Sequence, residues 1–157
     1  AVGDLPVHPV VGVDAAPRML AHARAKGIYA ELIEGDLMET LRDGGSAAWP
    51  LVLAADVMCY FGALDDAFAA IRARMAPGGW FAFSVETLLP DRAGAVPGNG
   101  EWALLRQGRC AHAPDYIRRA AERAGFQIRH FESETLRHEA GEPVPGLIVA
   151  LERRDDA

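Results

Sequence analysis

The chain has 157 residues, half of them hydrophobic, with 16 glycines and 10 prolines. This length suits one domain, and this composition is typical of a globular protein rather than a disordered one. The net charge of −6 argues against binding nucleic acid through a basic surface. No apolar run approaches the roughly 20 residues that a membrane span needs, so we expect no membrane partner.

The cysteines and histidines indicate neither a metal site nor a disulfide framework. Cys59 and Cys110 are far apart and form no CxxC motif, and the five histidines lack the spacing of zinc ligands. We therefore expect no metal. The rarity of cysteine, together with a start of the chain that does not resemble a signal peptide, indicates a cytoplasmic location.

The first elements predict a strand, a helix and a second strand. Residues 10–13 form a β-branched run that ends at Asp14, and Pro17 opens a helix that Gly27 can close. Residues 30–33 predict the next strand. A unit of this order has parallel strands and a right-handed crossover.

Two further strands flank the next predicted helix. Residues 51–55 are a continuous apolar run, typical of a strand covered on both faces. A stripe at helical spacing follows it, and Pro77-Gly78-Gly79 ends the helix before a strand over residues 80–85. The stripe consists of Leu64, Phe68, Ile71 and Met75.

The last third predicts a loop, a helix and a hairpin. Residues 89–108 are rich in Pro and Gly and predict a long loop that carries Trp102. Pro114 starts a helix that Gly125 ends. Residues 126–132 and 147–153 predict strands, which should be antiparallel neighbours because no helix joins them. The turn region between them contains Gly141, Pro143, Pro145 and Gly146.

This order of elements predicts an α/β fold: a Rossmann-like, mostly parallel sheet with helices on both faces and a C-terminal antiparallel hairpin. Ligands in such sheets bind beyond the carboxyl ends of the strands, where Asp14, Asp36 and Asp56 stand. Asp14 can accept hydrogen bonds from the ribose hydroxyls of a nucleoside cofactor, and nicotinamide cofactors use the same device. Its alternative role is that of a helix-start residue favoured by the helix dipole.

Residues 10–14, 34–37, 51–64 and 75–81 carry motifs that together resemble those of the class I, Rossmann-like S-adenosylmethionine-dependent methyltransferases. Residues 10–14 with Pro17, Met19 and Leu20 resemble the second-strand motif, and residues 34–37 resemble the third-strand motif. Residues 51–64 and 75–81 resemble the fourth-strand segment and the turn into the fifth strand. Residues 108–126, with Arg109, His112 and Tyr116, resemble a subgroup that is sometimes fused to tetratricopeptide repeats.

The resemblance implies how the cofactor S-adenosylmethionine is bound. Asp14, with Ala15 beside it, would hold the ribose. Asp36 and Leu37 would recognise adenine, and the alternative for Asp36 is a turn residue. The remaining implied contacts are Met19, whose alternative is a core methionine, and Ala55 and Asp56 near the reactive methyl group.

A catalytic base is needed only when the nucleophile carries a proton that must leave. Asp56, Tyr60 and His112 are the candidates, each with a structural role as the alternative. Cys59 is expected to pack in the interior, since this fold transfers the methyl group directly to the acceptor.

The resemblance has two departures. The position after Asp14 is Ala15 rather than the usual Ser or Thr, and the family's first strand with its glycine-rich loop is missing. The strands at residues 10–13 and 51–55 would then have no partner between them. We expect residues 1–157 to be one N-terminally truncated methyltransferase-like domain, with a strand from another chain or a rearranged sheet as alternatives.

The sequence thus predicts a methyltransferase that acts on an unidentified small-molecule or protein acceptor. One alternative is a nicotinamide-dependent oxidoreductase fragment. Another is a catalytically inactive domain that serves as an interaction module. Because the subgroup is sometimes fused to tetratricopeptide repeats, such a segment is a candidate partner in the intact protein.

Overall fold

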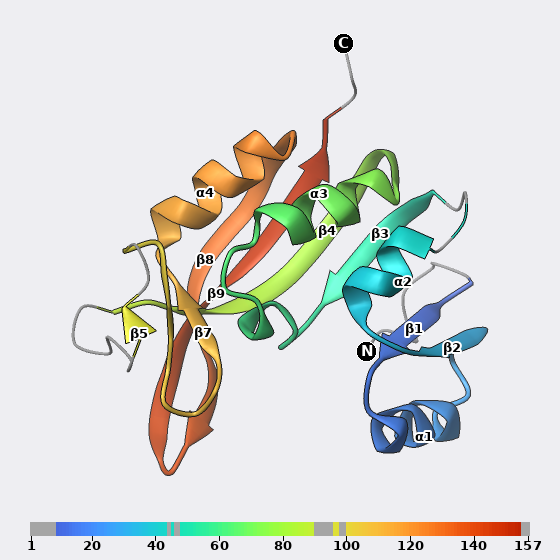
Figure 1. The fold of residues 1–157 in the computed structure, drawn as a ribbon, viewed down its shortest axis with the longest axis horizontal. Coiled ribbons are helices and arrows are strands. Elements are labelled where there is room, and N and C mark those ends of the chain that lie inside the picture. The colour runs from blue at the N-terminus through green and yellow to red at the C-terminus, as the bar shows by residue number, and fades with distance from the viewer. Residues whose placement is uncertain (1–8, 44, 46–47, 90–95, 98–99, 155–157) are drawn as a thin grey trace. The chain divides into compact units, whose positions relative to one another are not determined.

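The computed structural model describes residues 9–43, 45, 48–89, 96–97 and 100–154. The chain divides into two compact units, residues 1–47 and residues 48–157, and Figure 1 labels most of their elements. Across the described residues, every helix is too short or too polar to span a membrane.

The first unit is a strand–helix–strand unit followed by a short helix. It consists of β1 (Val11–Asp14), α1 (Pro17–Ala25), β2 (Glu31–Glu34) and α2 (Leu37–Asp43). The two strands are parallel, and Asp14 lies opposite Glu34 at their carboxyl ends. Pro17 occupies the first turn of α1, as predicted, where its missing N–H costs no hydrogen bond.

Helix α2 was not predicted. It has seven residues and no buried side chain, so it lacks the apolar stripe that reveals longer helices. A local signal was present, because Asp36 precedes the helix and Glu39 follows three positions later, as in a capping box.

The second unit contains one mixed sheet. Its strand order is β5-β6-β7-β4-β9-β8, and β3 pairs with β4 beside this path. The strands are β3 (Trp49–Ala54), β4 (Met75–Thr87), β5 (Val96–Pro97), β6 (Trp102–Leu104), β7 (Cys110–His112), β8 (Phe126–Glu139) and β9 (Glu142–Arg153). The helices are the 3-10 turn η2 (Met58–Tyr60), α3 (Asp65–Ala73) and α4 (Pro114–Arg123).

The strand pairing confirms the predicted fold class. β4 is parallel to β3 and, at its carboxyl end, to β7, whereas β8 and β9 form the predicted antiparallel hairpin. Among the described residues, β1 pairs only with β2 and β3 pairs only with β4.

An aromatic cluster forms the core of the second unit. α3 and α4 lie on the same face of the sheet in Figure 1. From α3, the fully buried Phe68 packs against Phe81, Phe83 and Phe126, with ring centroids 5.7, 5.4 and 6.3 Å away. These contacts tie the helix to β4 and to the start of β8.

Some element boundaries differ from the predictions. Met75 lies in β4 rather than in the preceding helix, because α3 ends at Ala73; its buried side chain still continues the apolar stripe. Trp102 and His112 belong to short strands within or just after the predicted loop.

The predicted turn at Gly141 is correct but shorter than expected. Pro143 and Pro145 lie within β9, in the part that pairs with β8 alone, so their missing N–H groups break no ladder with β4. Gly146 also lies within β9, where a Cβ atom would stand 2.6 Å from the carbonyl oxygen of Val85.

Candidate cofactor and acceptor sites

In the first unit, two carboxylates follow the carboxyl ends of adjacent strands. Asp14 ends β1 and Asp36 stands two residues after β2. The Gly35 backbone N–H donates to the Asp14 carbonyl oxygen at 3.2 Å, which extends the pairing of the strands up to the two acids. The parallel register therefore brings both acids to one edge of this small sheet.

Each of these carboxylates uses one oxygen for the following helix. Asp14 Oδ1 accepts a hydrogen bond from the Ala16 N–H at 2.7 Å. Asp36 Oδ1 accepts from Met38 and Glu39 at 2.8 and 3.0 Å. The helix-start and turn roles considered as alternatives are thus present, yet Oδ2 of each acid has no partner among the described residues and can accept from a ligand.

The neighbouring candidates Ala15, Met19 and Leu37 differ in exposure. Met19 is 55% exposed, so it is not a core side chain, whereas Leu20 beside it is buried. Ala15 is exposed and Leu37 is half-buried.

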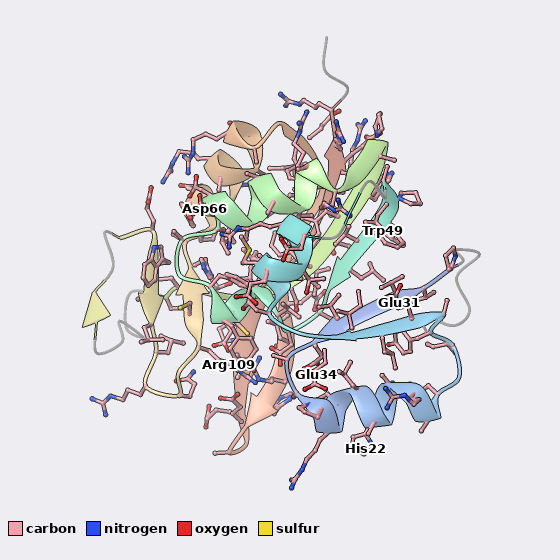
Figure 2. All side chains as sticks on the ribbon, turned by 45° about the vertical axis from the view of Figure 1, so that its right-hand side comes forward. His22, Glu31, Glu34, Trp49, Asp66 and Arg109 are labelled. Carbon is pink, nitrogen blue, oxygen red and sulfur yellow. The ribbon has the colours of Figure 1, made fainter. Side chains whose placement is uncertain are left out.

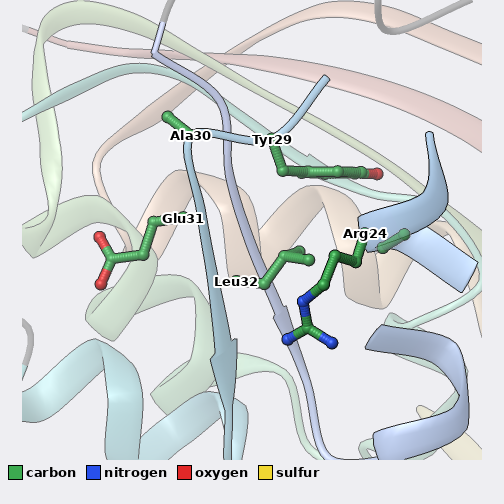
Figure 3. Close-up of a pocket in the computed structure, with 6 residues that line it drawn as sticks. Arg24, Tyr29, Ala30, Glu31 and Leu32 are labelled. Carbon is green, nitrogen blue, oxygen red and sulfur yellow. The ribbon is translucent and has the colours of Figure 1, made fainter. Parts of the chain in front are cut away.

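A pocket of about 180 Å³ lies at the opposite end of β2, as Figure 3 shows. Arg24, Tyr29 and Leu32 line it, while the Glu31 carboxylate points away from the Arg24 guanidinium. Because Asp14 and Asp36 follow the carboxyl ends of the strands, this pocket is separate from the predicted nucleoside site.

In the second unit, Asp56 has a strained backbone. Its φ of 56° lies in the left-handed region, which is uncommon for a residue other than glycine. The Asp56 N–H donates to Ser84 Oγ on β4 at 2.9 Å, which helps to hold this conformation. Strained residues of this kind concentrate at functional sites.

The Asp56 carboxylate belongs to a group of five charged side chains, here called the Asp56 cluster: Asp56, Glu86, Arg109, Arg137 and Glu139. Arg109 contacts Asp56 at 3.3 Å, Glu139 at 3.1 Å and Glu86 at 3.8 Å. Arg137 contacts Asp56 at 3.2 Å and Glu139 at 2.8 Å, and it also pairs with Glu86. Arg109 lies just before β7, as labelled in Figure 2.

Both guanidiniums stay charged. Burial works against the charge of Arg137, but hydrogen bonds to Glu86 and Glu139 outweigh it and raise the pKa above its ordinary value. Burial likewise opposes the charge of Arg109, and Tyr60 and Asp56 raise its pKa. Among the described residues, two permanent cations of the cluster are therefore shared by three carboxylates.

The predicted residues Tyr60 and Cys59 differ in their surroundings. Tyr60 is 63% exposed, and the Arg109 guanidinium lies 6.0 Å from the centre of its ring. Cys59 is buried, with Sγ 3.6 Å from the Asp56 carbonyl oxygen. Burial and the nearby Asp56 charge raise the Cys59 pKa to about 11, so its thiol stays protonated and fits the expected packing role.

The His112 ring is fully buried on β7. Its Nε2 lies 3.0 and 2.9 Å from the carbonyl oxygens of Phe61 and Gly62, so it must carry the proton and donate to them. Burial lowers the pKa of His112, which keeps the ring neutral. Nδ1 has no partner in the described part of the chain. The imidazole thus anchors the segment that follows Tyr60.

The sequence reasoning did not select Glu86, Arg137 or Glu139. Glu86 carried a signal, because it is a charged residue at the end of an apolar strand. Arg137 and Glu139 carried none, since only the register of the long hairpin brings them to Asp56.

Comparison with known proteins identifies the family. The profile of the methyltransferase domain family matches residues 4–131. The chain belongs to this family. No curated protein sequence matches it. The family match supports the predicted methyltransferase and gives no support to the nicotinamide-dependent alternative.

Solved structures of S-adenosylmethionine-dependent methyltransferases share the fold. The enzyme from Methanosarcina mazei superposes with a TM-score of 0.72 at 13% identity, over 94% of this chain and 82% of that one. The enzyme from Mesorhizobium loti superposes with a TM-score of 0.62 at 24% identity, over 92% of this chain and 80% of that one. A protein with another activity in its description shares the fold as well: the [4+2]-cyclase SpnF superposes with a TM-score of 0.72 at 13% identity, over 99% of this chain and 70% of that one. The predicted methyltransferase fold is therefore confirmed.

Proposed function

We propose that this S-adenosylmethionine-dependent methyltransferase holds the adenosine part of its cofactor at the edge formed by β1 and β2. The observation that carries the proposal is that Oδ1 of Asp14 and of Asp36 serves the following helix, while Oδ2 of each acid has no partner among the residues that the structure describes. Asp14 would accept from the ribose hydroxyls and Asp36 from the adenine amino group. Ala15, Met19 and Leu37 would border the nucleoside.

Further cofactor contacts are proposed from the resemblance alone. Bound S-adenosylmethionine supplies a methyl group that is activated by a sulfonium. By resemblance, Ala55 and Asp56 line the cofactor near this group. Asp56, whose side chain is 48% exposed, can take a proton from an acceptor. The exposed Tyr60 hydroxyl can orient that acceptor, whereas the buried His112 would act by holding the chain after Tyr60.

We further propose that residues 1–157 work as one methyltransferase domain in the cytoplasm. Its acceptor is a small molecule or a protein, and its net charge of −6 disfavours nucleic acid. A tetratricopeptide-repeat segment in the intact protein stays a prediction from the resemblance.

Calorimetric titration tests the cofactor assignment. We expect S-adenosylhomocysteine to bind the purified chain. NADH, the control, should show no binding. Binding of NADH alone would favour the oxidoreductase alternative. If neither compound binds, the inactive interaction module becomes the better explanation for this chain.

Asp14→Asn separates the two roles of Asp14. The asparagine oxygen still accepts from the Ala16 N–H, but the charge and the second acceptor are lost. We expect the affinity for S-adenosylhomocysteine to fall about tenfold or more, because hydrogen bonds to charged groups contribute about 1.5–3 kcal/mol. Stability should change by less than about 0.5 kcal/mol.

Glu31→Gln is the matched control, since Glu31 is exposed at the opposite end of β2. The affinity of Glu31→Gln for S-adenosylhomocysteine should equal that of the unmodified chain. An unchanged dissociation constant in Asp14→Asn would refute the ribose assignment.

A further inference from the structure

Two arginines hold the Asp56 carboxylate, one on each of its oxygens. Arg137 Nη1 donates to Oδ1 at 3.2 Å, and Arg109 Nη2 donates to Oδ2 at 3.3 Å. A carboxylate that is bound at both oxygens cannot turn about its Cβ–Cγ bond without breaking one of these contacts. The side chain is 48% exposed, and each oxygen keeps a second lone pair for a ligand. The direction of the carboxylate is therefore set by its arginine partners.

Arg137 is the partner that ties Asp56 to the interior. Its Nη2 pairs with Glu86 near the end of β4, and the Glu86 side chain is only 2% exposed. Its Nε donates to Glu139 at 2.8 Å. Arg109 lies farther from Glu86, at 3.8 Å. The planar guanidinium of Arg137 thus bridges a carboxylate that is fixed in the interior and the partly exposed carboxylate of Asp56.

The backbone of Asp56 also needs support. Its φ of 56° is strained for a residue other than glycine, and the hydrogen bond from its N–H to Ser84 Oγ restrains it. Relaxation to an extended conformation would carry the carboxylate away from its present position. The contact with Arg137 opposes this relaxation from the side chain, as the contact with Ser84 does from the backbone.

We propose that Arg137 is a positioning residue for the methyl transfer, which acts by fixing the direction of the Asp56 carboxylate. The inference rests on the proposed function, in which Asp56 lines the cofactor near its reactive methyl group. That methyl group belongs to a positively charged sulfonium, whereas the sulfur of S-adenosylhomocysteine is uncharged. A carboxylate held toward this sulfur therefore favours S-adenosylmethionine over S-adenosylhomocysteine.

Other roles of Arg137 predict different preferences between the two cofactor forms. A guanidinium repels a sulfonium, so a purely electrostatic role would make S-adenosylmethionine bind relatively more tightly once Arg137 is removed. A purely structural role would weaken the binding of both compounds by the same factor. A reduced preference for S-adenosylmethionine is expected only if Arg137 works through the direction of Asp56.

Calorimetric titration of each variant with both compounds tests the proposal. The quantity compared is the dissociation constant of S-adenosylhomocysteine divided by that of S-adenosylmethionine. We expect this ratio to fall about three- to fivefold in Asp56→Asn and about two- to threefold in Arg137→Gln, the range that partly exposed charge pairs support. In the Asp56→Asn background, Arg137→Gln should cause no further fall. An unchanged or increased ratio in either single variant would overturn the proposal, as would a further fall in the combined one.

A second variant guards against loss of the fold. Arg137→Gln leaves the buried Glu86 carboxylate with only the longer contact to Arg109 among the described residues, which can destabilise the chain. Glu86→Gln combined with Arg137→Gln removes both charges and should lower the ratio to the same extent; an unchanged ratio there refutes the positioning role. Arg129→Gln, also on β8, is the matched control, because Arg129 pairs with Glu152. Its ratio should equal that of the unmodified chain.

The same titrations separate the two proposals. If S-adenosylhomocysteine does not bind the unmodified chain, the cofactor assignment fails and the positioning role falls with it. If S-adenosylhomocysteine binds and Asp14→Asn weakens it, but the ratio is the same with and without Arg137, the positioning role alone is refuted and the cofactor assignment stands.

Discussion

Replacing His112 with alanine is expected to lower the free energy of unfolding by about 3 kcal/mol. The change leaves a cavity where a fully buried ring stood, beside Tyr116, whose ring lies parallel at 6.2 Å. It also removes the donor that serves the carbonyl oxygens of Phe61 and Gly62. Denaturant unfolding measures the loss.

His112→Gln is the matched variant, because its amide nitrogen can donate to the same carbonyl oxygens. It should recover more than half of the stability lost in His112→Ala. If both variants lose the same stability, the hydrogen bonds from Nε2 contribute nothing, and the anchoring role is wrong.

The pH dependence of stability gives a second test of His112. Its pKa in the folded chain lies below the ordinary value of 6.5, so the unfolded chain takes up the proton first as the pH falls. The stability contributed by the neutral ring is therefore complete above pH 6.5 and is lost progressively below it. Between about pH 7 and pH 5, the unmodified chain should lose more stability than His112→Gln. Parallel curves would contradict a buried neutral imidazole.

Replacing Phe68 with alanine is expected to destabilise the second unit by about 3–5 kcal/mol. Phe68 is fully buried and touches three aromatic rings on β4 and β8, so the cavity lies between helix and sheet and cannot collapse easily. Phe68→Leu fills most of the space and should cost less than about 1.5 kcal/mol.

Phe131→Ala is the control for the Phe68 variants. Phe131 is half-buried, and its main ring contact is the Arg118 guanidinium at 3.7 Å. We expect a loss of at most about 1 kcal/mol in denaturant unfolding. A loss in Phe68→Ala that is no larger than this would show that the aromatic cluster is not the core of the unit.

The strand-end acids were predictable because their signals are local. A β-branched run that ends at Asp14 and a proline three residues later define a strand and a helix start within eight residues. The same stretch carries the resemblance to methyltransferases. Asp36 has a comparable local context, and both acids stand at the predicted edge of parallel strands.

The environment of His112 was not predictable. The sequence suggests a catalytic base, because His112 lies near Tyr116 in a segment that resembles the family. No local feature of the sequence distinguishes a buried histidine ring from an exposed one. Its burial depends on β7 pairing with β4 and on the turn after Tyr60, which lies about 50 residues earlier in the chain.

The sequence by itself determined the α/β fold class, the family and the acids at the strand ends, because hydrophobic periodicity and short motifs depend on neighbouring residues. The tertiary structure decided which charges meet. Arg137 is 81 residues from Asp56, and only the register of the β8–β9 hairpin brings its guanidinium to that carboxylate and to Glu86. Contacts between residues so far apart in the sequence depend on the packing of the whole second unit, which no local pattern encodes.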